Sequence, residues 1–250
     1  MLNIVIPMAG AGSRFAKAGY QDPKPLIPLF GKPMIQVVID NLTPACEHRF
    51  IFICQRAHVK EYGLREKLMQ FSPQSELIEI DGLTEGAACT VLKATHLINT
   101  NDPLMIANSD QYVDTDINDY LASESERHLD GLIMTMKASH PKWSFAATDA
   151  TGMVTLVAEK DPISEDATVG IYNFARGADF VRAANQMIEK DLRVNGEFYV
   201  APVYNEMIGS GAKIGIANIG DDQGNGMFGI GTPEDLELFI GNPKVQAWFK

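Results

Sequence analysis

Short apolar runs alternate with helical patterns through the first 110 residues. Four runs have the length and composition of buried strands, and they cover residues 2–7, 49–54, 77–80 and 103–107. Between them, Pro33 opens a helix with Ile35, Val38 and Leu42 on one face, and further helices are predicted over 57–71 and 85–98. This β-α-β-α order requires right-handed crossovers and predicts a mainly parallel sheet.

The second half of the chain is richer in strands. Strands are predicted over 131–137, 144–150, 154–158, 168–175 and 213–219, and helices around 180–188 and 198–208. Thr232 followed by Pro233, Glu234 and Asp235 predicts another helix start, with a hydroxyl cap, proline in the first turn and acids near the positive end of the dipole. No linker or repeat divides the sequence. We therefore expect a single α/β domain over 1–250, with a mixed, mainly parallel sheet and helices on both faces.

The charge is unevenly distributed. The chain has 21 Lys+Arg against 32 Asp+Glu, a formal net charge of −11, which disfavours nucleic acids and anionic membranes as partners. Residues 1–40 contain four basic and two acidic residues, so the remainder carries about −13. A basic segment on an acidic body indicates a small anionic ligand.

The cysteines and the N-terminal run predict a cytoplasmic location. Cys46, Cys54 and Cys89 form no CxxC pair, and we interpret them as buried thiols in a reducing compartment. The apolar run 2–8 is too short for a signal-peptide core or a membrane span, and no basic residue precedes it.

A glycine loop directly follows the first predicted strand. Its residues are Ala9, Gly10, Ala11, Gly12 and Ser13. Such loops can turn several backbone N–H groups toward an anion, so a phosphate cradle is the functional interpretation, and a plain tight turn is the structural one. A dinucleotide site fits less well, because Phe15 stands where a small residue is needed and Gln55-Arg56 stands where a ribose-binding acid is expected.

Lys24 lies between Pro23 and Pro25. Two prolines stiffen the backbone and limit where the ammonium group can reach, which suits neutralisation of phosphate oxygens. The alternative is a solvated surface loop with a bystander lysine.

Three linked segments together resemble a known family. Gly10-x-Gly12-x-Arg14, then residues 23–28 (PKPLIP), then residues 31–35 (GKPMI) are similar to the signature of nucleotidyltransferases that act on sugar 1-phosphates. The resemblance implies a Rossmann-like nucleotidyltransferase fold, with a nucleotide-binding half over 1–110 and an acceptor-binding half over 111–250. It also implies Mg²⁺-dependent release of pyrophosphate in nucleotide-sugar biosynthesis, with a nucleoside triphosphate and a small phosphorylated acceptor as partners. A homo-oligomer is compatible with it.

The resemblance assigns roles on the nucleotide side. Arg14 and Lys24 would grip the triphosphate, and the amides of Ala9 to Ser13 would cradle it. Gly82, Glu85 and Gly86 resemble the small-residue turn beneath the nucleobase, although the same segment is also typical of a helix start. The nucleobase itself stays open.

The metal site is expected at Asp110. This residue follows a buried strand and resembles the family's Mg²⁺ ligand; a turn aspartate is the alternative. Relatives usually carry a second aspartate just before Ile-Gly-Thr-Pro-Glu-Asp, where this chain has Gly229. Asp222, or Asp221, is the substitute ligand that we expect, unless Asp110, water and the triphosphate suffice.

The acceptor side is expected in the second half of the chain. The resemblance implies that Glu159 binds acceptor hydroxyls and Lys160 the acceptor phosphate, near Gly170; a strand-end salt pair is the alternative for the two charged residues. Ala146 stands where many relatives have a glycine that contacts the sugar, and Glu197 is a further acceptor contact or lid residue.

Three other functions compete with this interpretation. One is a cytidylyltransferase for a phosphorylated alcohol or amine such as phosphocholine, with Trp143, Phe145 and Tyr199 around a quaternary amine. The second is a GT-A glycosyltransferase that uses Asp114-Thr115-Asp116, although Asp116 equally suits a helix cap. The third is a non-catalytic nucleotide-binding protein. The five histidines lack metal spacing and are expected on the surface or in the core.

Overall fold

Four parallel strands form the N-terminal part of the central sheet. They are β1 (Leu2–Pro7), β4 (His48–Gln55), β5 (Glu76–Ile80) and β6 (Leu104–Ala107). β1 pairs in parallel with both β4 and β6, and β4 pairs in parallel with β5. The structure is a computed structural model that describes residues 1–10 and 12–250. It confirms the four strands predicted in this half.

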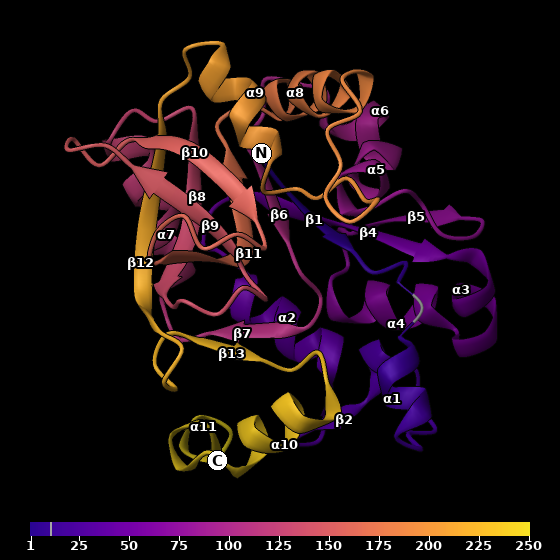
Figure 1. The fold of residues 1–250 in the computed structure, drawn as a ribbon. Coiled ribbons are helices and arrows are strands. Elements are labelled where there is room, and N and C mark those ends of the chain that lie inside the picture. Colours follow the sequence, from indigo (N-terminus) through magenta and orange to yellow (C-terminus); the bar gives the residue numbers. More distant parts are fainter. Residues whose placement is uncertain (11) are drawn as a thin grey trace.

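The C-terminal part adds mostly antiparallel strands. They are β8 (Gly131–Lys137), β9 (Ser144–Thr148), β10 (Val154–Glu159), β11 (Asp166–Phe174) and β12 (Ile214–Asp221). β11 runs antiparallel to β6, β8 and β9, whereas β12 is parallel to β8. The resulting order is β10-β9-β11-β6-β1-β4-β5, with β8 and β12 branching from β11 (Figure 1). The expected mixed sheet is confirmed.

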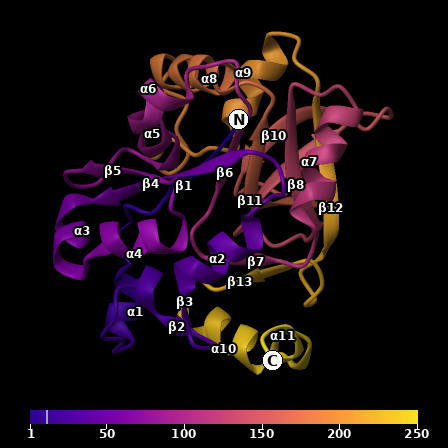
Figure 2. The same ribbon diagram turned by 180° about the vertical axis from the view of Figure 1, so that it is seen from behind.

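Helices cover both faces of this sheet (Figures 1 and 2). One face carries α2 (Met34–Leu42), α3 (Arg56–Tyr62), α4 (Leu64–Phe71) and α7 (Ile117–Glu126), and the other carries α5 (Ala87–Val91), α6 (Thr95–Ile98), α8 (Gly177–Glu189) and α9 (Val203–Gly209). Successive residues of a strand point to opposite faces. Accordingly, Phe50 and Phe52 of β4 belong to one buried cluster, and Ile51 and Ile53 to the other.

Three helix predictions need corrected boundaries. The helix expected over 57–71 is two helices, because Gly63 adopts a left-handed conformation (φ 59°) between α3 and α4. The helix expected over 85–98 begins at Ala87 and is interrupted by a 3₁₀ turn over Leu92–Ala94. The helix expected over 198–208 is α9, which starts five residues later, after Pro202.

Short elements that the sequence patterns did not indicate surround the sheet's carboxyl edge. They are α1 (Ser13–Lys17), the hairpin of β2 (Pro28–Leu29) and β3 (Lys32–Pro33), the ribbon of β7 (Gln111–Val113) and β13 (Met227–Gly229), and α11 (Pro243–Trp248). The predicted helix at Thr232 is α10 (Pro233–Gly241), and the Thr232 side chain accepts a hydrogen bond from the Asp235 N–H as expected. α10 and α11 lie beside the β2–β3 hairpin in both views (Figures 1 and 2).

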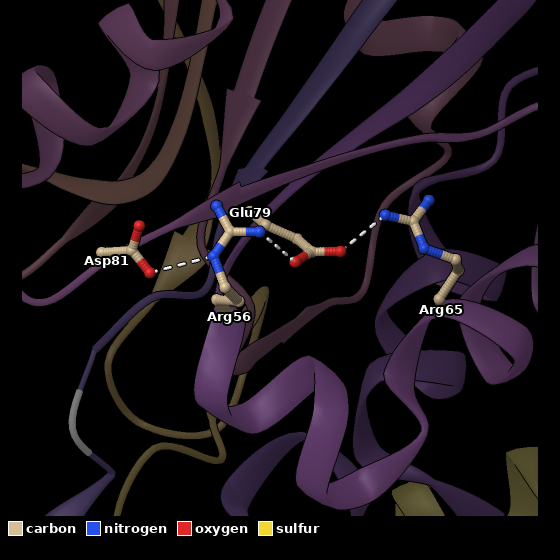
Figure 3. A network of polar contacts seen from close by, with 4 residues as sticks. All are labelled: Arg56, Arg65, Glu79 and Asp81. Atoms are coloured by element: carbon tan, nitrogen blue, oxygen red, sulfur yellow. Dashed lines mark hydrogen bonds and ion pairs between the residues drawn. The ribbon is translucent and has the colours of Figure 1, made fainter.

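A surface network ties α3 and α4 to the edge strand β5. Arg56 donates to Glu79 at 2.8 Å and to Asp81 at 3.0 Å, while Arg65 reaches the other oxygen of Glu79 at 2.7 Å (Figure 3). Glu79 thus holds a guanidinium group from each helix against the strand.

The cysteines differ in their exposure to solvent. The three cysteines are free thiols, but only Cys54 is buried; Cys46 is exposed and Cys89 half-buried, so the expectation of three buried thiols is wrong. Over the described ranges, 1–10 and 12–250, no helix has both the length and the apolar character needed to cross a bilayer.

Candidate functional site

A cavity of about 400 Å³ opens at the carboxyl ends of β1 and β6. The chain passes from β1 to β4 and β5 on one side, then returns to place β6 on the other side of β1. Strand order therefore reverses between β1 and β6, and α/β sheets bind ligands at such a point. Pro7 and Met8 of the β1 end and Asn108, Ser109 and Asp110 of the β6 end line the cavity.

Part of the predicted phosphate loop lies at this cavity. Gly10 and Gly12 line it, whereas Ala9 is buried and its carbonyl accepts a hydrogen bond from Gln55 Nε2 at 2.6 Å. Gly12 has φ 60°, and a Cβ built on it would lie 3.6 Å from the Cβ of Lys24. Glycine at this position therefore gives the loop its left-handed turn, in ordinary van der Waals reach of the lysine side chain.

The remaining residues of the predicted phosphate loop do not line this cavity or are not described. Ser13 and Arg14 are exposed at the start of α1, and neither lines the cavity. Ala11, predicted as part of the cradle, lies outside the described residues.

Lys24 and Asp110 form an ion pair inside the cavity. Lys24 sits in a 3₁₀ turn (Lys24–Leu26) directly after Pro23, and its ammonium group contacts Asp110 Oδ2. The two side chains are 20% and 29% exposed, so a ligand can still reach both. The pair places one cation and one carboxylate at the reversal point of the sheet. The cation can bind a phosphate group, and the carboxylate can bind the metal ion that accompanies it.

A second cavity, of about 310 Å³, adjoins the first. Asn108 lines both cavities, so they meet at the end of β6. Gly170 leaves room for the Asn108 side chain at this junction, because it has φ 80° and a Cβ on it would overlap Asn108 Nδ2. The Asn108 N–H also donates to the Gly170 carbonyl at 3.1 Å. The predicted acceptor residue Gly170 therefore lies at the boundary between the two cavities.

Glu159 is the acidic group of the second cavity. It ends β10, accepts a hydrogen bond from the Ser144 hydroxyl, and has its pKa raised chiefly by burial. Glu197 is exposed and does not line the cavity, but its charge also raises the pKa of Glu159. A half-buried carboxylate of this kind can accept hydrogen bonds from ligand hydroxyls.

Lys160 lies beside Glu159, next to the second cavity. Its Nζ donates to the Tyr199 hydroxyl at 2.7 Å and lies 4.7 Å from the centre of that ring, and the hydrogen bond raises the lysine pKa. Its backbone has φ 58°. Glu159 and Gly170 thus line the same cavity, and Lys160 lies beside it with its ammonium group on Tyr199, which also lines it. The acceptor roles of the three residues stay a prediction.

Ala146 is placed elsewhere. It is fully buried within the core and does not line the cavity, so its side chain has no surface to offer to an acceptor.

One side of the predicted nucleobase turn packs against protein, and another side is open. Gly86 has φ 134°, and a Cβ on it would overlap the Phe198 backbone, whose carbonyl accepts from the Ala88 N–H at 3.0 Å. Glu85 pairs with Arg193 at 2.6 Å and lines another cavity. At Gly82, by contrast, a Cβ would meet nothing within 4 Å among the described residues. Gly86 directly precedes α5, so Glu85 lies before this helix and not in its first turn.

The Asp114-Thr115-Asp116 motif has a structural role. Asp114 pairs with Lys244 of α11, and the Asp116 side chain caps α7 by accepting from the Asn118 N–H at 2.8 Å. Neither residue lines the two cavities. The Asp-x-Asp motif therefore does not support the glycosyltransferase interpretation.

Comparison with known proteins agrees with this geometry. The family model described as nucleotidyl transferase matches residues 4–199. The chain belongs to this family. A solved structure described as a nucleoside-diphosphate-sugar pyrophosphorylase from Vibrio cholerae RC9 has a TM-score of 0.80 at 28% identity, covering 96% of this chain and 100% of that one.

More distant matches extend the likeness. The inositol-1-phosphate CTP transferase from T. maritima has a TM-score of 0.72 at 13% identity over 99% of this chain and 94% of that one, which shows the shared fold. The bifunctional protein GlmU of Methanocaldococcus jannaschii is 23% identical over 121 residues, or 48% of this chain. The chain spans 28% of the length of that relative and 49% of another curated relative.

The residues of this nucleotidyl transferase family member fit a Mg²⁺ ion only in part. Among the described residues no group of three or more His, Cys, Asp or Glu side chains gathers as a metal site. Asp110 offers a partly exposed carboxylate, and Mg²⁺ commonly takes one or two carboxylates plus substrate phosphates. Asp222 lines a different cavity together with Gly229 and Asp235, so the structure does not bring it to Asp110.

Sequence reasoning missed several residues of the site. His58 of α3 lines the first cavity, although the histidines were expected to have surface or core roles. Gln111 lines the second cavity, is 5% exposed, and its Nε2 has no hydrogen-bond partner among the described residues. Gln111 directly follows Asp110 in the sequence, and this position could have indicated it as a site residue. His58 lies in a helix with no motif, and only the fold brings it to the site.

Proposed function

We propose that this protein transfers a nucleoside monophosphate from a nucleoside triphosphate to a sugar 1-phosphate and releases pyrophosphate. The observation that carries the proposal is the pair of cavities that adjoin at Asn108. One holds a glycine loop, a lysine and a carboxylate, and the other holds Glu159 with Lys160 beside it. Two substrates that must react with each other need adjoining sites of these two kinds.

The first cavity would take the triphosphate. Lys24 and the loop amides would neutralise the polyphosphate, with Arg14 reaching it from α1, and Asp110 would hold a Mg²⁺ ion that supplies further charge neutralisation when bound. Lys24 would then exchange its contact with Asp110 for one with phosphate oxygens. The turn Gly82–Gly86, with Glu85, stays a proposed contact for the nucleobase.

The second cavity would take the acceptor. Glu159 would accept hydrogen bonds from acceptor hydroxyls, Lys160 would bind the acceptor phosphate, and Gly170 and Glu197 would border it. An acceptor phosphate oxygen attacks the α-phosphorus in line, the new O–P bond forms, and the bond to the β-phosphate oxygen breaks, so that pyrophosphate leaves. No covalent protein intermediate is needed.

The three aromatic residues expected around a quaternary amine favour an acceptor that lacks this cationic group. Lys142 Nζ lies 4.5 Å from the centre of the Trp143 ring, and Lys160 covers the Tyr199 ring. Phe145 is fully buried. Two of the three rings expected around a quaternary amine therefore already face lysines, and the third is out of reach.

The test is pyrophosphate release with each nucleoside triphosphate, Mg²⁺, and a panel of sugar 1-phosphates, inositol phosphate and phosphocholine. We expect release with at least one sugar 1-phosphate. Lys24→Met should lower kcat/KM by at least about 100-fold, as loss of an anion-stabilising group does. Lys32→Met is the matched control, because Lys32 pairs with Asp40 on the surface at 2.6 Å and does not line the cavity.

Three results would contradict the proposal. Release with phosphocholine alone would favour the amine-specific alternative. Tight triphosphate binding without release for any acceptor would favour a non-catalytic nucleotide-binding protein. Near-normal turnover of Lys24→Met would remove Lys24 from the site.

A further inference from the structure

One aromatic cluster connects the two sides of the Lys24–Asp110 pair. Its members come from the β2–β3 hairpin, β7, β13, α10 and the end of α11, and they are Phe30, Tyr112, Phe228, Phe239, Trp248 and Phe249. Each ring has at least one neighbouring ring centre within 5.8 Å. Stacked and edge-on aromatic pairs stabilise a fixed geometry beyond simple burial.

The cluster holds the segment that carries Lys24. Lys24 leads into the β2–β3 hairpin, and Phe30 lies at its tip with φ 48°. A non-glycine residue keeps this left-handed conformation only where its surroundings hold it. The Phe30 ring stacks on Phe249 at 4.5 Å with an interplanar angle of 10°, and its centre lies 6.1 Å from that of its other neighbour, Phe239. Phe249 thus fixes the hairpin from outside.

The cluster also holds the segment that carries Asp110. Tyr112, two residues after Asp110, stacks on Trp248 at 5.2 Å and lies 6.0 Å from Phe249. The Ile230 N–H donates to the Asp110 carbonyl at 2.9 Å, and Gly231 lies so close that a Cβ would overlap Asp110 Oδ2. Ile230 and Gly231 lead directly into α10, which carries Phe239.

We propose that Phe249 is a positioning residue for the reaction. By packing against Phe30 on one side and Tyr112 on the other, it sets the separation of the Lys24 ammonium and the Asp110 carboxylate. Both groups face the triphosphate under the proposed function, on which this inference rests. Small misplacements of such groups by remote substitutions lower rates by about 100-fold in enzymes that depend on positioning.

The test compares Phe249→Ala with Phe249→Tyr, which keeps the ring. Triphosphate kcat/KM and acceptor KM are measured by pyrophosphate release, and triphosphate Kd in Mg²⁺ is measured separately by calorimetry. We expect Phe249→Ala to lower triphosphate kcat/KM and to weaken triphosphate binding, each by about tenfold, with a smaller change in acceptor KM. For Phe249→Tyr, triphosphate kcat/KM and triphosphate Kd should both stay within about twofold of wild type.

Phe71→Ala is the matched control. Phe71 is also a half-buried phenylalanine, at the end of α4, and has no aromatic ring partner among the described residues. It should lower the melting temperature without changing the triphosphate constants. If Phe249→Ala does the same, Phe249 is only a packing residue and the proposal is overturned. Should Phe249→Ala not fold, Phe249→Leu replaces it, since leucine keeps apolar volume but removes the stacked ring.

Failure of the proposed function gives a different result. If no acceptor leads to pyrophosphate release from the wild-type protein, calorimetry still decides the positioning role. A triphosphate Kd that is equal in wild type and Phe249→Ala, or no triphosphate binding by the wild type, overturns it.

Discussion

Glu124 makes the stability of this protein depend on pH in a way that can be worked out from its surroundings. It lies on α7, is 8% exposed, and its Oε1 has no hydrogen-bond partner among the described residues. Burial raises its pKa from 4.5 to about 7, and the neighbouring Asn173 side chain only partly opposes this. Tyr120 and Tyr204, whose own pKa values Glu124 helps to raise, lie nearby.

The sign follows from proton binding. Between pH 4.5 and about 7 the folded state holds this proton more tightly than the unfolded state, so stability falls as pH rises. The contribution is fully present below pH 4.5 and is lost above about pH 7. A pKa difference of this size is worth about 3 kcal/mol, at about 1.36 kcal/mol for each pH unit.

Glu124→Gln should remove this dependence, because the amide has no proton to lose. We expect the variant and the wild type to differ little at pH 5, and the variant to gain about 2–3 kcal/mol relative to wild type by pH 8. The free energies of unfolding come from urea titrations at pH 5, 6, 7 and 8. Glu126→Gln, an exposed position on the same helix, is the control and should change stability by less than about 0.5 kcal/mol throughout. A difference between Glu124→Gln and wild type that is constant from pH 5 to 8 would refute the reasoning.

Other substitutions test the site and its supports. Gly170→Ala and Gly152→Ala both force alanine to φ 80°, but only the Cβ at position 170 would also overlap Asn108. In urea titrations the free energy of unfolding should fall by about 1–2 kcal/mol for Gly152→Ala and by at least twice that for Gly170→Ala. Equal losses would exclude the clash. Thr232→Ala should cost about 1 kcal/mol in the same assay, through the lost cap of α10, and no loss would contradict that role. Gly229→Asp would direct its carboxylate toward Asp235, whose Oδ2 lies 3.5 Å from a Cβ built at position 229, in the cavity that also holds Asp222 and not Asp110. The Mg²⁺ concentration needed for half-maximal triphosphate binding, measured by calorimetry, should therefore change by no more than about twofold, and a tenfold fall would contradict this placement.

The sheet was predictable because its signals are local. β1, β4, β5 and β6 lie between helical layers, and their short apolar runs reveal them without any knowledge of partners. The cap at Thr232 is equally local, since the hydroxyl and the N–H that it accepts are three residues apart. Where the local signal is weak, boundaries moved: Gly63 breaks a helical pattern that looks continuous.

The site was predictable only where a motif or a strand end marked it. Lys24 stands between prolines and Asp110 follows a strand, and the structure brings the two together. Ala146 was misplaced because its inferred role came from a resemblance, whereas its burial depends on packing across the sheet. His58 and the β7–β13 ribbon depend on contacts between segments far apart in the chain, which no local pattern contains.

The charged network on β5 also bears on how copies of this protein meet. β5 is the last strand of the sheet, and an edge strand has unpaired N–H and C=O groups that a strand from another molecule can join. Here Arg56, Arg65, Glu79 and Asp81 occupy this edge with their charges already paired (Figure 3). A strand added there would have to displace water from four charged groups, so the ion pairs that hold α3 and α4 in place also discourage aggregation through the open end of the sheet.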